Sequence, residues 1–493
     1  MDAVLINPNL IFQRSDPFTT GIVYMPISLA YVAASLRHAG FQISVIDAFA
    51  EKPKQSLTFE KYTRMGLYVE EVFERIPKNT IFVFIYAINL SNHDSICDIT
   101  KYIKTRKPEI IITVLENTQA VTAYQLEKIA HELYDIGVDF TISGEGDYRA
   151  VQFLKSIKNG RNENELAKID GLGCRNFSSP PIGKIKNLDD LPFPAWDLFP
   201  LKNYWKMHFA HGPQTRKRYM PLLTSRGCPY SCAFCVVPAT NNRKWRPRSP
   251  INIVTEIEYY IKQYQVKEFH IEDLDPTIDD KRIREFCQII IQKKLSIAWK
   301  IVAGTKVETI KNEETVDLMA KAGCTYVSIS PETGSPELLK TMLKPFDLDH
   351  AINMIKKMNQ VNIKTQACFV LGFPGEKDSD RILTKKMIKN LTKSGIDEIA
   401  LFIVTPVPGS RIYNKLSGYN TLSELNFSPT WRDDYKKLNK FRLHLYFCFI
   451  LWKIIYHPKK ILIQALNFFF RRFQTKMEMV PYRAIVLRLL WGR

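Results

Sequence analysis

The segment PLLTSRGCPYSCAFC, residues 221–235, joins a strand-like run to a loop that carries three cysteines. Pro221 to Thr224 have the pattern of a short buried strand, and Cys228, Cys232 and Cys235 follow within eight residues of one another. Three thiols this close together can surround one metal centre. A [4Fe-4S] cube has four irons, so three thiolates leave one iron open for a substrate or cofactor. The segment therefore predicts a redox-active site at the end of a strand.

A zinc ion is the alternative for the same cysteines, and it is normally held by four Cys or His ligands. The motif itself offers no fourth ligand, although Cys174 or His211 could approach it in the folded chain. The other six of the nine cysteines are scattered singly, and buried packing is the ordinary role of such residues. An odd number of cysteines with one tight group indicates a reducing compartment rather than a disulfide framework.

Five further strand-like runs follow the first and alternate with helical stretches. This alternation predicts a parallel sheet that closes partway into a barrel. Because the carboxyl ends of parallel strands meet at one rim, we expect the loops after the strands to converge with the cysteines. The expected strands are Pro221 to Thr224, Glu268 to Glu272, Ala298 to Val302, Tyr326 to Ser330, Thr365 to Leu371 and Ile399 to Thr405.

The first 150 residues show a similar alternation of β-branched runs and helical stretches, which is typical of an α/β unit. Asn7-Pro8 follows the first run, and Gly144, Glu145 and Gly146 follow the last one. Ligands of open α/β sheets bind beside such strand-end loops. The expected strands are Val4 to Ile6, Gln42 to Ile46, Ile81 to Tyr86, Ile110 to Leu115 and Phe140 to Ile142.

The expected fold class is α/β with four parts. Residues 1–150 form a Rossmann-like domain, 151–207 a connector, 208–416 a partial (β/α)6 barrel, and 417–493 a helical C-terminal region. The connector contains LDDLPFPAWD, residues 188–197, whose prolines remove backbone donors and favour extended chain.

The cysteine spacing, three residues and then two with an aromatic before the last cysteine, resembles that of the radical S-adenosylmethionine (SAM) superfamily. The resemblance covers roughly Tyr219 to Ile412. It implies that Cys228, Cys232 and Cys235 hold a [4Fe-4S] cluster whose open iron binds SAM. An electron from a donor such as flavodoxin or ferredoxin then splits SAM into methionine and a 5′-deoxyadenosyl radical.

The same resemblance implies a set of SAM contacts on the barrel rim and assigns no further catalytic residue. For the acidic and threonine positions the alternative role is helix capping, for the glycine it is a turn, and for the phenylalanine it is core packing. The implied contacts are Tyr230, Phe234, Glu272, Asp273, Glu332, Thr333 and Gly372.

The order of an α/β domain, this connector and a barrel is similar to that of cobalamin-binding radical SAM enzymes. LINP at 5–8, VIDA at 45–48 and GEGD at 144–147 carry this resemblance. It implies cobalamin contacts from Asn7, Pro8, Gly144, Glu145 and Gly146. Axial ligation of cobalt through an Asp-x-His-x-x-Gly motif is excluded, since no histidine sits in that frame, and His93 is interpreted as a loop or helix-start residue.

The resemblance implies that the enzyme is a cobalamin-dependent methyltransferase acting on an unactivated carbon of a small or lipid-like substrate. Two alternatives stay open. Some cobalamin-binding relatives form rings instead of transferring methyl groups. A radical SAM enzyme of another class could modify tRNA and use its basic C-terminal region on phosphates.

Most of the positive charge lies at the C-terminus. The net charge is +19, and residues 436–493 hold 13 Lys or Arg against the single acid Glu478. Leu443 to Trp452 and Ile461 to Phe470 are apolar runs of ten residues each, half of the roughly 20 needed to span a bilayer. They predict either an interfacial membrane anchor or helices packed on the barrel. Long apolar runs disfavour a nucleic-acid surface.

The N-terminus lacks a basic region before an apolar stretch, so we expect a cytoplasmic protein, with peripheral contact to the cytoplasmic face of a membrane if the apolar runs form an anchor.

Overall fold

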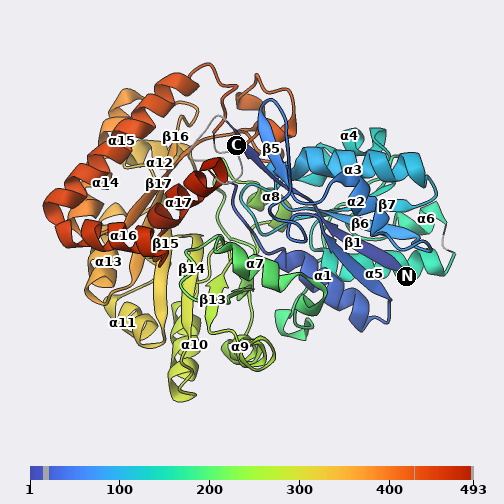
Figure 1. The fold of residues 1–493 in the computed structure, drawn as a ribbon, viewed down its shortest axis with the longest axis horizontal. Helices are drawn as coiled ribbons and strands as arrows, with labels where there is room; N and C mark the ends of the chain where they lie inside the picture. The colour runs from blue at the N-terminus through green and yellow to red at the C-terminus, as the bar shows by residue number, and fades with distance from the viewer. Residues whose placement is uncertain (15–20, 161, 427, 490–493) are drawn as a thin grey trace.

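The computed structural model describes residues 1–14, 21–160, 162–426 and 428–489. A mostly parallel sheet and a fully parallel sheet lie side by side, and three helices of the C-terminal region cover part of the second sheet (Figure 1). One continuous group of buried apolar side chains extends through both sheets. The expected α/β class, with a Rossmann-like unit, a six-stranded partial barrel and a helical C-terminal region, is confirmed.

The first sheet has the strand order β3-β1-β6-β7-β8-β9. Its first five strands are parallel, and β9 runs antiparallel to β8. β1 and β6 are buried along their whole length, which explains their unbroken apolar sequence. The strands are β1 (Ala3–Asn7), β3 (Ile43–Asp47), β6 (Phe82–Ala87), β7 (Ile111–Glu116), β8 (Phe140–Ile142) and β9 (Leu172–Gly173).

Helices cover the first sheet, and two of them, α1 and α5, carry residues that contact the barrel. α1 packs along α5, and α2 packs along α3. α5 passes through residue 150 and β9 lies beyond it, so the first unit extends past the expected boundary at residue 150. The helices are α1 (Ile27–His38), α2 (Val69–Glu74), α3 (His93–Arg106), α4 (Ala130–Asp135) and α5 (Gly146–Lys158).

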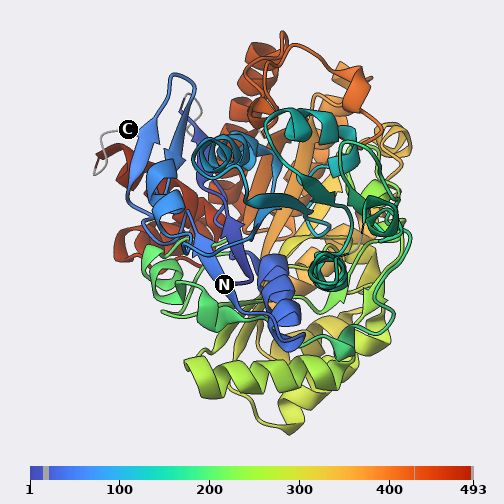
Figure 2. The same ribbon diagram turned by 90° about the vertical axis from the view of Figure 1, so that its right-hand side faces the viewer.

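A small antiparallel sheet was not predicted from the sequence. It has the order β2-β5-β4 and consists of β2 (Leu10–Gln13), β4 (Ser56–Thr58) and β5 (Tyr62–Met65). These strands are short and come from separated segments, so no local alternation of apolar residues announces them. The sheet lies at the side of the first domain that faces the C-terminal helices, at the upper left in Figure 2.

The second sheet is fully parallel and has the order β10-β13-β14-β15-β16-β17. All six expected strands are present. β14 and β15 are longer than expected, so Ala303 to Thr305 belong to a strand end rather than to a loop. The strands are β10 (Met220–Leu222), β13 (Glu268–Ile271), β14 (Ala298–Thr305), β15 (Cys324–Glu332), β16 (Lys364–Leu371) and β17 (Glu398–Ile403).

The helices between these strands include α9 (Pro250–Tyr264), α10 (Asp280–Gln292), α11 (Glu313–Lys321), α13 (Leu348–Gln360) and α14 (Asp378–Lys393).

Three helices form most of the C-terminal region: α15 (Tyr435–Tyr456), α16 (Pro458–Phe470) and α17 (Lys476–Leu489). α15 packs on α14 and β17 through Leu445 and Phe449, which are fully buried. α16 contributes no buried residue. Residues 490–493 of the expected helical region lie outside the described residues. Among the described helices, none is both long and apolar enough to cross a membrane.

Buried ion pairs join the first domain to the barrel. Asp147, in the first turn of α5, accepts two hydrogen bonds from the Arg226 guanidinium, at 2.7 and 3.1 Å. Glu145, one residue before α5, pairs with Arg246. Arg226 and Arg246 face each other across the two short strands β11 (Ser225–Arg226) and β12 (Arg246–Pro247). The strand pair that supports the cysteine loop is therefore tied to the first domain.

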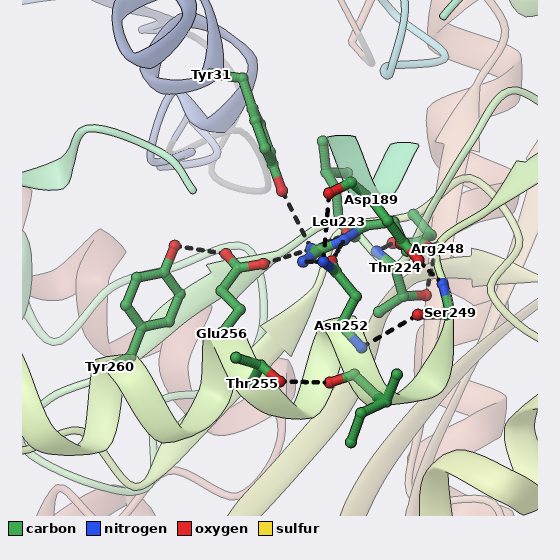
Figure 3. A network of polar contacts seen from close by, with 12 residues as sticks. Tyr31, Asp189, Leu223, Thr224, Arg248, Ser249, Asn252, Thr255, Glu256 and Tyr260 are labelled. Atoms are coloured by element: carbon green, nitrogen blue, oxygen red, sulfur yellow. Dashed lines mark hydrogen bonds and ion pairs between the residues drawn. The ribbon is translucent and has the colours of Figure 1, made fainter. Parts of the chain in front are cut away.

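Arg248 forms a second connection between the domains (Figure 3). Its guanidinium donates to the Tyr31 hydroxyl of α1 at 3.1 Å and to the Leu223 carbonyl at 2.9 Å, and it pairs with Glu256 of α9. The Tyr260 hydroxyl donates to Glu256 in turn. Because each charge is buried and paired, the network holds one relative position of the two sheets.

Replacing Asp147 with alanine is expected to lower the free energy of unfolding by about 3 kcal/mol, because Arg226 would keep a buried charge without its main partner. Urea denaturation followed by tryptophan fluorescence measures the change. Asp135→Ala is the control, since Asp135 pairs with Arg175 at 2.8 Å on the exposed surface and such pairs contribute less than about 1 kcal/mol. Equal losses in the two variants would contradict a special role for the buried pair.

Candidate functional site

The loop that carries the three cysteines begins immediately after β11. Gly227 adopts a φ of +80°, and a Cβ there would lie 2.0 Å from the Lys244 carbonyl oxygen, so only glycine fits. Cys228, Cys232 and Cys235 are each partly buried and line the same cavity. Folding therefore places all three thiols around one space, as the sequence predicts.

The spacing of the three sulfurs is wider than a single tetrahedral ion requires. A tetrahedral zinc ion with bonds of about 2.3 Å draws its sulfur ligands to within about 4 Å of one another. In the described chain, the cysteine triad is not among the groups whose ligand atoms all lie within 4.8 Å of one another. A [4Fe-4S] cluster instead distributes its thiolates over different irons. The thiol-only donor set and its wider spacing fit the cluster.

The two residues considered as a fourth zinc ligand do not complete a zinc site with the cysteines among the described residues. The Cys174 thiol lies 3.5 Å from Glu163, outside the cavity. His211 does line the cavity, and its Nδ1 lies 2.6 Å from the Glu272 carboxylate, but in the described chain it does not form a group with two of these cysteines whose ligand atoms lie within 4.8 Å of one another. Burial raises the pKa of the Cys228 thiol to about 12, and nearby Lys344 partly opposes that shift. Metal binding is what makes such buried thiols ionise.

The cavity around the cysteines, here called the cluster cavity, has a volume of about 280 Å³. One wall comes from the barrel rim and the other from the carboxyl-terminal side of the first sheet, so the cavity lies between the two domains. Four of the predicted SAM contacts line it: Tyr230, Phe234, Glu272 and Glu332. Residues of the first domain that line it include Tyr86, Ile88, Asn117, Gln119 and Thr122.

Three carboxylates, those of Glu272, Asp275 and Glu332, face the cluster cavity. Glu332 ends β15 with a φ of +63° and pairs with Lys344, which also lies 5.8 Å from the centre of the Phe234 ring. Lys306, Lys344 and Lys476 line the same cavity, so its carboxylates are balanced by ammonium groups overall. Glu272 and Asp275 have no lysine partner among the described ion pairs and are the carboxylates that could meet the ammonium and sulfonium groups of SAM.

Asp275 is a cavity residue that the sequence interpretation missed. Its Oδ1 accepts hydrogen bonds from Thr277 and Thr305, whereas its buried Oδ2 has no partner among the described residues. Burial raises the pKa of this carboxyl to about 6. The only sequence signal was its position two residues after Asp273 in the same rim loop, which does not show which carboxylate faces inward.

The other three predicted SAM contacts do not line the cluster cavity. Asp273 is fully buried and accepts hydrogen bonds from the Thr224 and Ser225 side chains, so it holds the strand that leads to the cysteines. The Thr333 hydroxyl lies 2.9 Å from that of Thr384. A Cβ on Gly372 would lie 2.5 Å from Leu438 of α15. These residues shape the rim, and their contact with SAM stays a prediction.

The five predicted cobalamin contacts are also absent from the described lining of the cavity. Asn7 donates to Asp47 at 2.9 Å, and the Gly144 N–H donates to the buried Glu116. Glu145 is used by Arg246 in the domain connection. Pro8 is buried, and Gly146 packs near Val32. Cobalamin contact by these five residues therefore stays a prediction.

His93 begins α3, as expected for a helix-start residue. Its Nδ1 lies 3.3 Å from the Tyr124 hydroxyl, and its Nε2 lies 3.1 Å from Glu132 and 3.3 Å from Cys97. It belongs to neither cavity wall.

A second and larger cavity, here called the outer chamber, adjoins the cluster cavity. It has a volume of about 770 Å³ and lies between the small antiparallel sheet, β17, α15 and α17. The two cavities share Ile22, Tyr24, Thr122, His211, Gln366, Phe402 and Lys476 in their walls. The outer chamber therefore leads toward the cysteines.

Comparisons with known proteins agree with this geometry. Residues 222–388 match the family model described as the radical SAM superfamily. An uncharacterized methyltransferase of Pyrococcus horikoshii is 28% identical over 371 residues, which cover 70% of this chain and 77% of that protein. The anaerobic magnesium-protoporphyrin IX monomethyl ester cyclase of a Synechocystis strain is 26% identical over 77% of this chain and 70% of its own length.

A solved structure shows the same fold over most of the chain. It is the radical SAM methyltransferase TsrM of Kitasatospora setae with cobalamin and a [4Fe-4S] cluster bound. The TM-score is 0.61 at 16% identity, with 85% of this chain and 76% of that chain covered. The family match comes from the barrel, and the likeness in fold extends to the first domain.

Replacing Cys228, Cys232 or Cys235 with alanine is expected to remove the cluster, because two thiolates cannot hold the cube. Iron and acid-labile sulfide, measured after anaerobic reconstitution, should fall from about four of each per chain toward zero. Cys174→Ser is the control and should retain full iron. If an alanine variant still bound one zinc ion per chain and the wild type bound no iron, the cluster assignment would be wrong.

Proposed function

We propose that this chain, a member of the radical SAM superfamily, is a cobalamin-dependent methyltransferase that acts on an unactivated carbon of an apolar substrate. The observation that carries the proposal is the cluster cavity, in which the three cysteines face the carboxyl-terminal side of the first sheet. Ligands of open α/β sheets bind on that side. A cofactor on the first domain and SAM on the barrel would therefore meet at this cavity.

In this proposal the bound cluster supplies the electron that cleaves SAM to a 5′-deoxyadenosyl radical, and the corrin supplies the methyl group. The chain's own residues position these reactants. Cys228, Cys232 and Cys235 hold the cluster and leave one iron open. Asp275 and Glu272 offer carboxylates to the cationic groups of SAM. The apolar wall around Ile88 and Phe402 leaves the radical no solute to react with except the substrate held in the site.

The wall formed by the first domain suits a corrin, whose edge carries amide side chains. Gln119 lines the cavity with a buried Oε1 that has no partner among the described residues. Thr405 does the same with its hydroxyl from the barrel side. Buried polar atoms of this kind are normally hydrogen-bonded, so they point to a polar ligand.

The similarity to a relative named as a cyclase supports ring formation as the second candidate reaction. Both reactions begin with reductive cleavage of SAM and differ in the fate of the substrate radical. Product analysis separates them, because a methyltransferase adds one carbon to its substrate and a cyclase adds none.

Exposed apolar side chains on α15 and α16 support peripheral contact with a membrane. Phe447, Phe469 and Phe470 are 67%, 76% and 67% exposed. Basic residues, among them Lys459, Arg471 and Arg472, surround them. Large exposed apolar patches mark interaction sites, and cationic borders fit anionic headgroups. α15 also packs on the barrel. In this proposal one face of the C-terminal region packs on the barrel and the other contacts the membrane, so both interpretations of the sequence apply.

The reconstituted wild type, given SAM, hydroxocobalamin and a low-potential reductant without oxygen, is expected to form 5′-deoxyadenosine. It should also form S-adenosylhomocysteine as the corrin takes the methyl group of SAM. Ala120→Trp, which inserts an indole from the first-domain wall, should reduce corrinoid retention with unchanged iron content. Absence of 5′-deoxyadenosine despite a full cluster would refute the proposal, and failure of the wild type to retain a corrinoid would refute its cobalamin part.

The triple variant F447S/F469S/F470S is expected to lose most of its sedimentation with vesicles that contain phosphatidylglycerol. Each aromatic ring contributes roughly 2 kcal/mol when buried in the interface. Ile182→Ser is the control, because Ile182 is equally exposed but lies in the connector. Equal partitioning of the triple variant and the wild type would show that these helices do not bind the membrane.

A further inference from the structure

The outer chamber is apolar along most of its length. Phe12 of β2, Leu401 of β17, Tyr446 and Ile450 of α15, and Met479 of α17 all line it. Ile450 also belongs to the exposed apolar surface of α15. The chamber therefore extends from the surface proposed to contact a membrane to the wall that it shares with the cluster cavity.

Arg483 of α17 is a buried cation in this apolar chamber. The side chain lies in the chamber wall and the residue is only 6% exposed. It donates to the Gly21 carbonyl at 2.6 Å and lies 5.0 Å from the centre of the Phe209 ring. In the described chain, no carboxylate oxygen lies within 4.0 Å of it. Burial lowers its pKa to about 9.

Lys476, at the start of the same helix, lies where the two cavities meet. Its ammonium donates to the Gln366 side chain at 3.2 Å and reaches the Val302 carbonyl at 3.4 Å. The nearby Glu398 carboxylate accepts from the Tyr326 hydroxyl and from the Met477 N–H instead. Burial lowers the pKa of this lysine. Two cations of α17 thus face the chamber without an ion-pair partner among the described residues.

The remaining charges of the chamber wall have their own contacts. Glu424 pairs with Lys61 at 2.8 Å, and the Arg442 guanidinium donates to Asn439 and Ser428. Asp94 contacts Ser423. Buried charges in proteins are normally paired, since an isolated ion loses its hydration without compensation. Arg483 is therefore the buried cation of this chamber whose charge has no ion-pair partner among the described residues, so it is available to an anionic ligand.

Building on the proposed function, we infer that the outer chamber binds the substrate as an amphipathic anion. Its carboxylate or phosphate group lies at Arg483, and its apolar body extends along β17 and α15. Lys476 and Arg483 are seven residues apart on α17, which separates them by about 10 Å along the helix. An anion held at Arg483 thus has its reacting carbon at the junction with the cluster cavity, beside Lys476.

The test is displacement of the neutral fluorophore 1-aminoanthracene from the full-length protein. The F447S/F469S/F470S background reduces binding of the probe to the exposed helices. Decanoate and decyl phosphate are expected to displace it at concentrations at least tenfold below that of decanol, because charge-assisted hydrogen bonds contribute about 1.5–3 kcal/mol. The two anions also distinguish a carboxylate from a phosphate headgroup.

Variants at Arg483 assign the preference to this residue. Arg483→Gln should bring decanoate to the level of decanol, while Arg483→Lys should keep the preference. Arg472→Gln is the matched control, since Arg472 is exposed and lies outside the chamber. Equal displacement by acid and alcohol in the wild-type chamber would overturn the inference, as would an undiminished preference in Arg483→Gln.

The binding assay requires neither SAM nor electrons. Loss of the anion preference with intact SAM cleavage would therefore overturn the inference alone. A preserved preference without SAM cleavage would overturn the proposed function alone.

Discussion

Two buried ion pairs, Asp147 with Arg226 and Glu145 with Arg246, set the arrangement on which the site depends. Arg226 lies two residues before Cys228, so the pairs join the base of the cysteine loop directly to the first turn of α5. Removing a charge from water is costly, and these charges are stable only when the two domains meet in this way. Because the charges must stay paired, the ion pairs fix the distance between the cysteines and the first sheet.

The cluster cavity is a consequence of this contact between domains. The barrel alone would expose its cysteines and carboxylates to solvent. The first sheet alone would expose the carboxyl-terminal ends of its strands. Together they enclose a space lined by Phe402 and Ile88 as well as by Glu272 and Asp275. Radical chemistry benefits from such an enclosure, because the radical can reach only the C–H bonds held in the site and buried charges act more strongly. The ion pairs thus serve the chemistry indirectly, through the shape they maintain.

The C-terminal helices combine three roles that their sequence does not separate. One face of α15 packs on the barrel through Leu445 and Phe449, while its other face carries exposed Phe447. α16 adds apolar surface without entering the core. α17 returns to the barrel and closes the outer chamber with Lys476 and Arg483. An apolar chamber that opens beside an apolar surface suits a substrate that partitions into membranes, since it need not pass through water.

Much of the fold and the centre of the site followed from the sequence alone. The eleven expected strands appear in the two sheets because a buried parallel strand requires a continuous apolar run, which is a local property. The three cysteines share a cavity because eight residues of loop cannot separate them. The sequence did not show which loop side chains point into the cavity, and only the tertiary structure did. Asp275 rather than Asp273 faces the cavity, because Thr224, between β10 and β11, and Ser225 of β11 bind Asp273.

The tertiary structure also decided the role of Glu145, whose partner Arg246 lies 101 residues away. It likewise brought Arg483 to a chamber that begins at β2, more than 450 residues earlier in the chain. Local pattern determines which segments become strands, helices and metal-binding loops. Which charges remain free to meet a ligand is determined by partners distant in sequence, and only the folded chain brings those partners together.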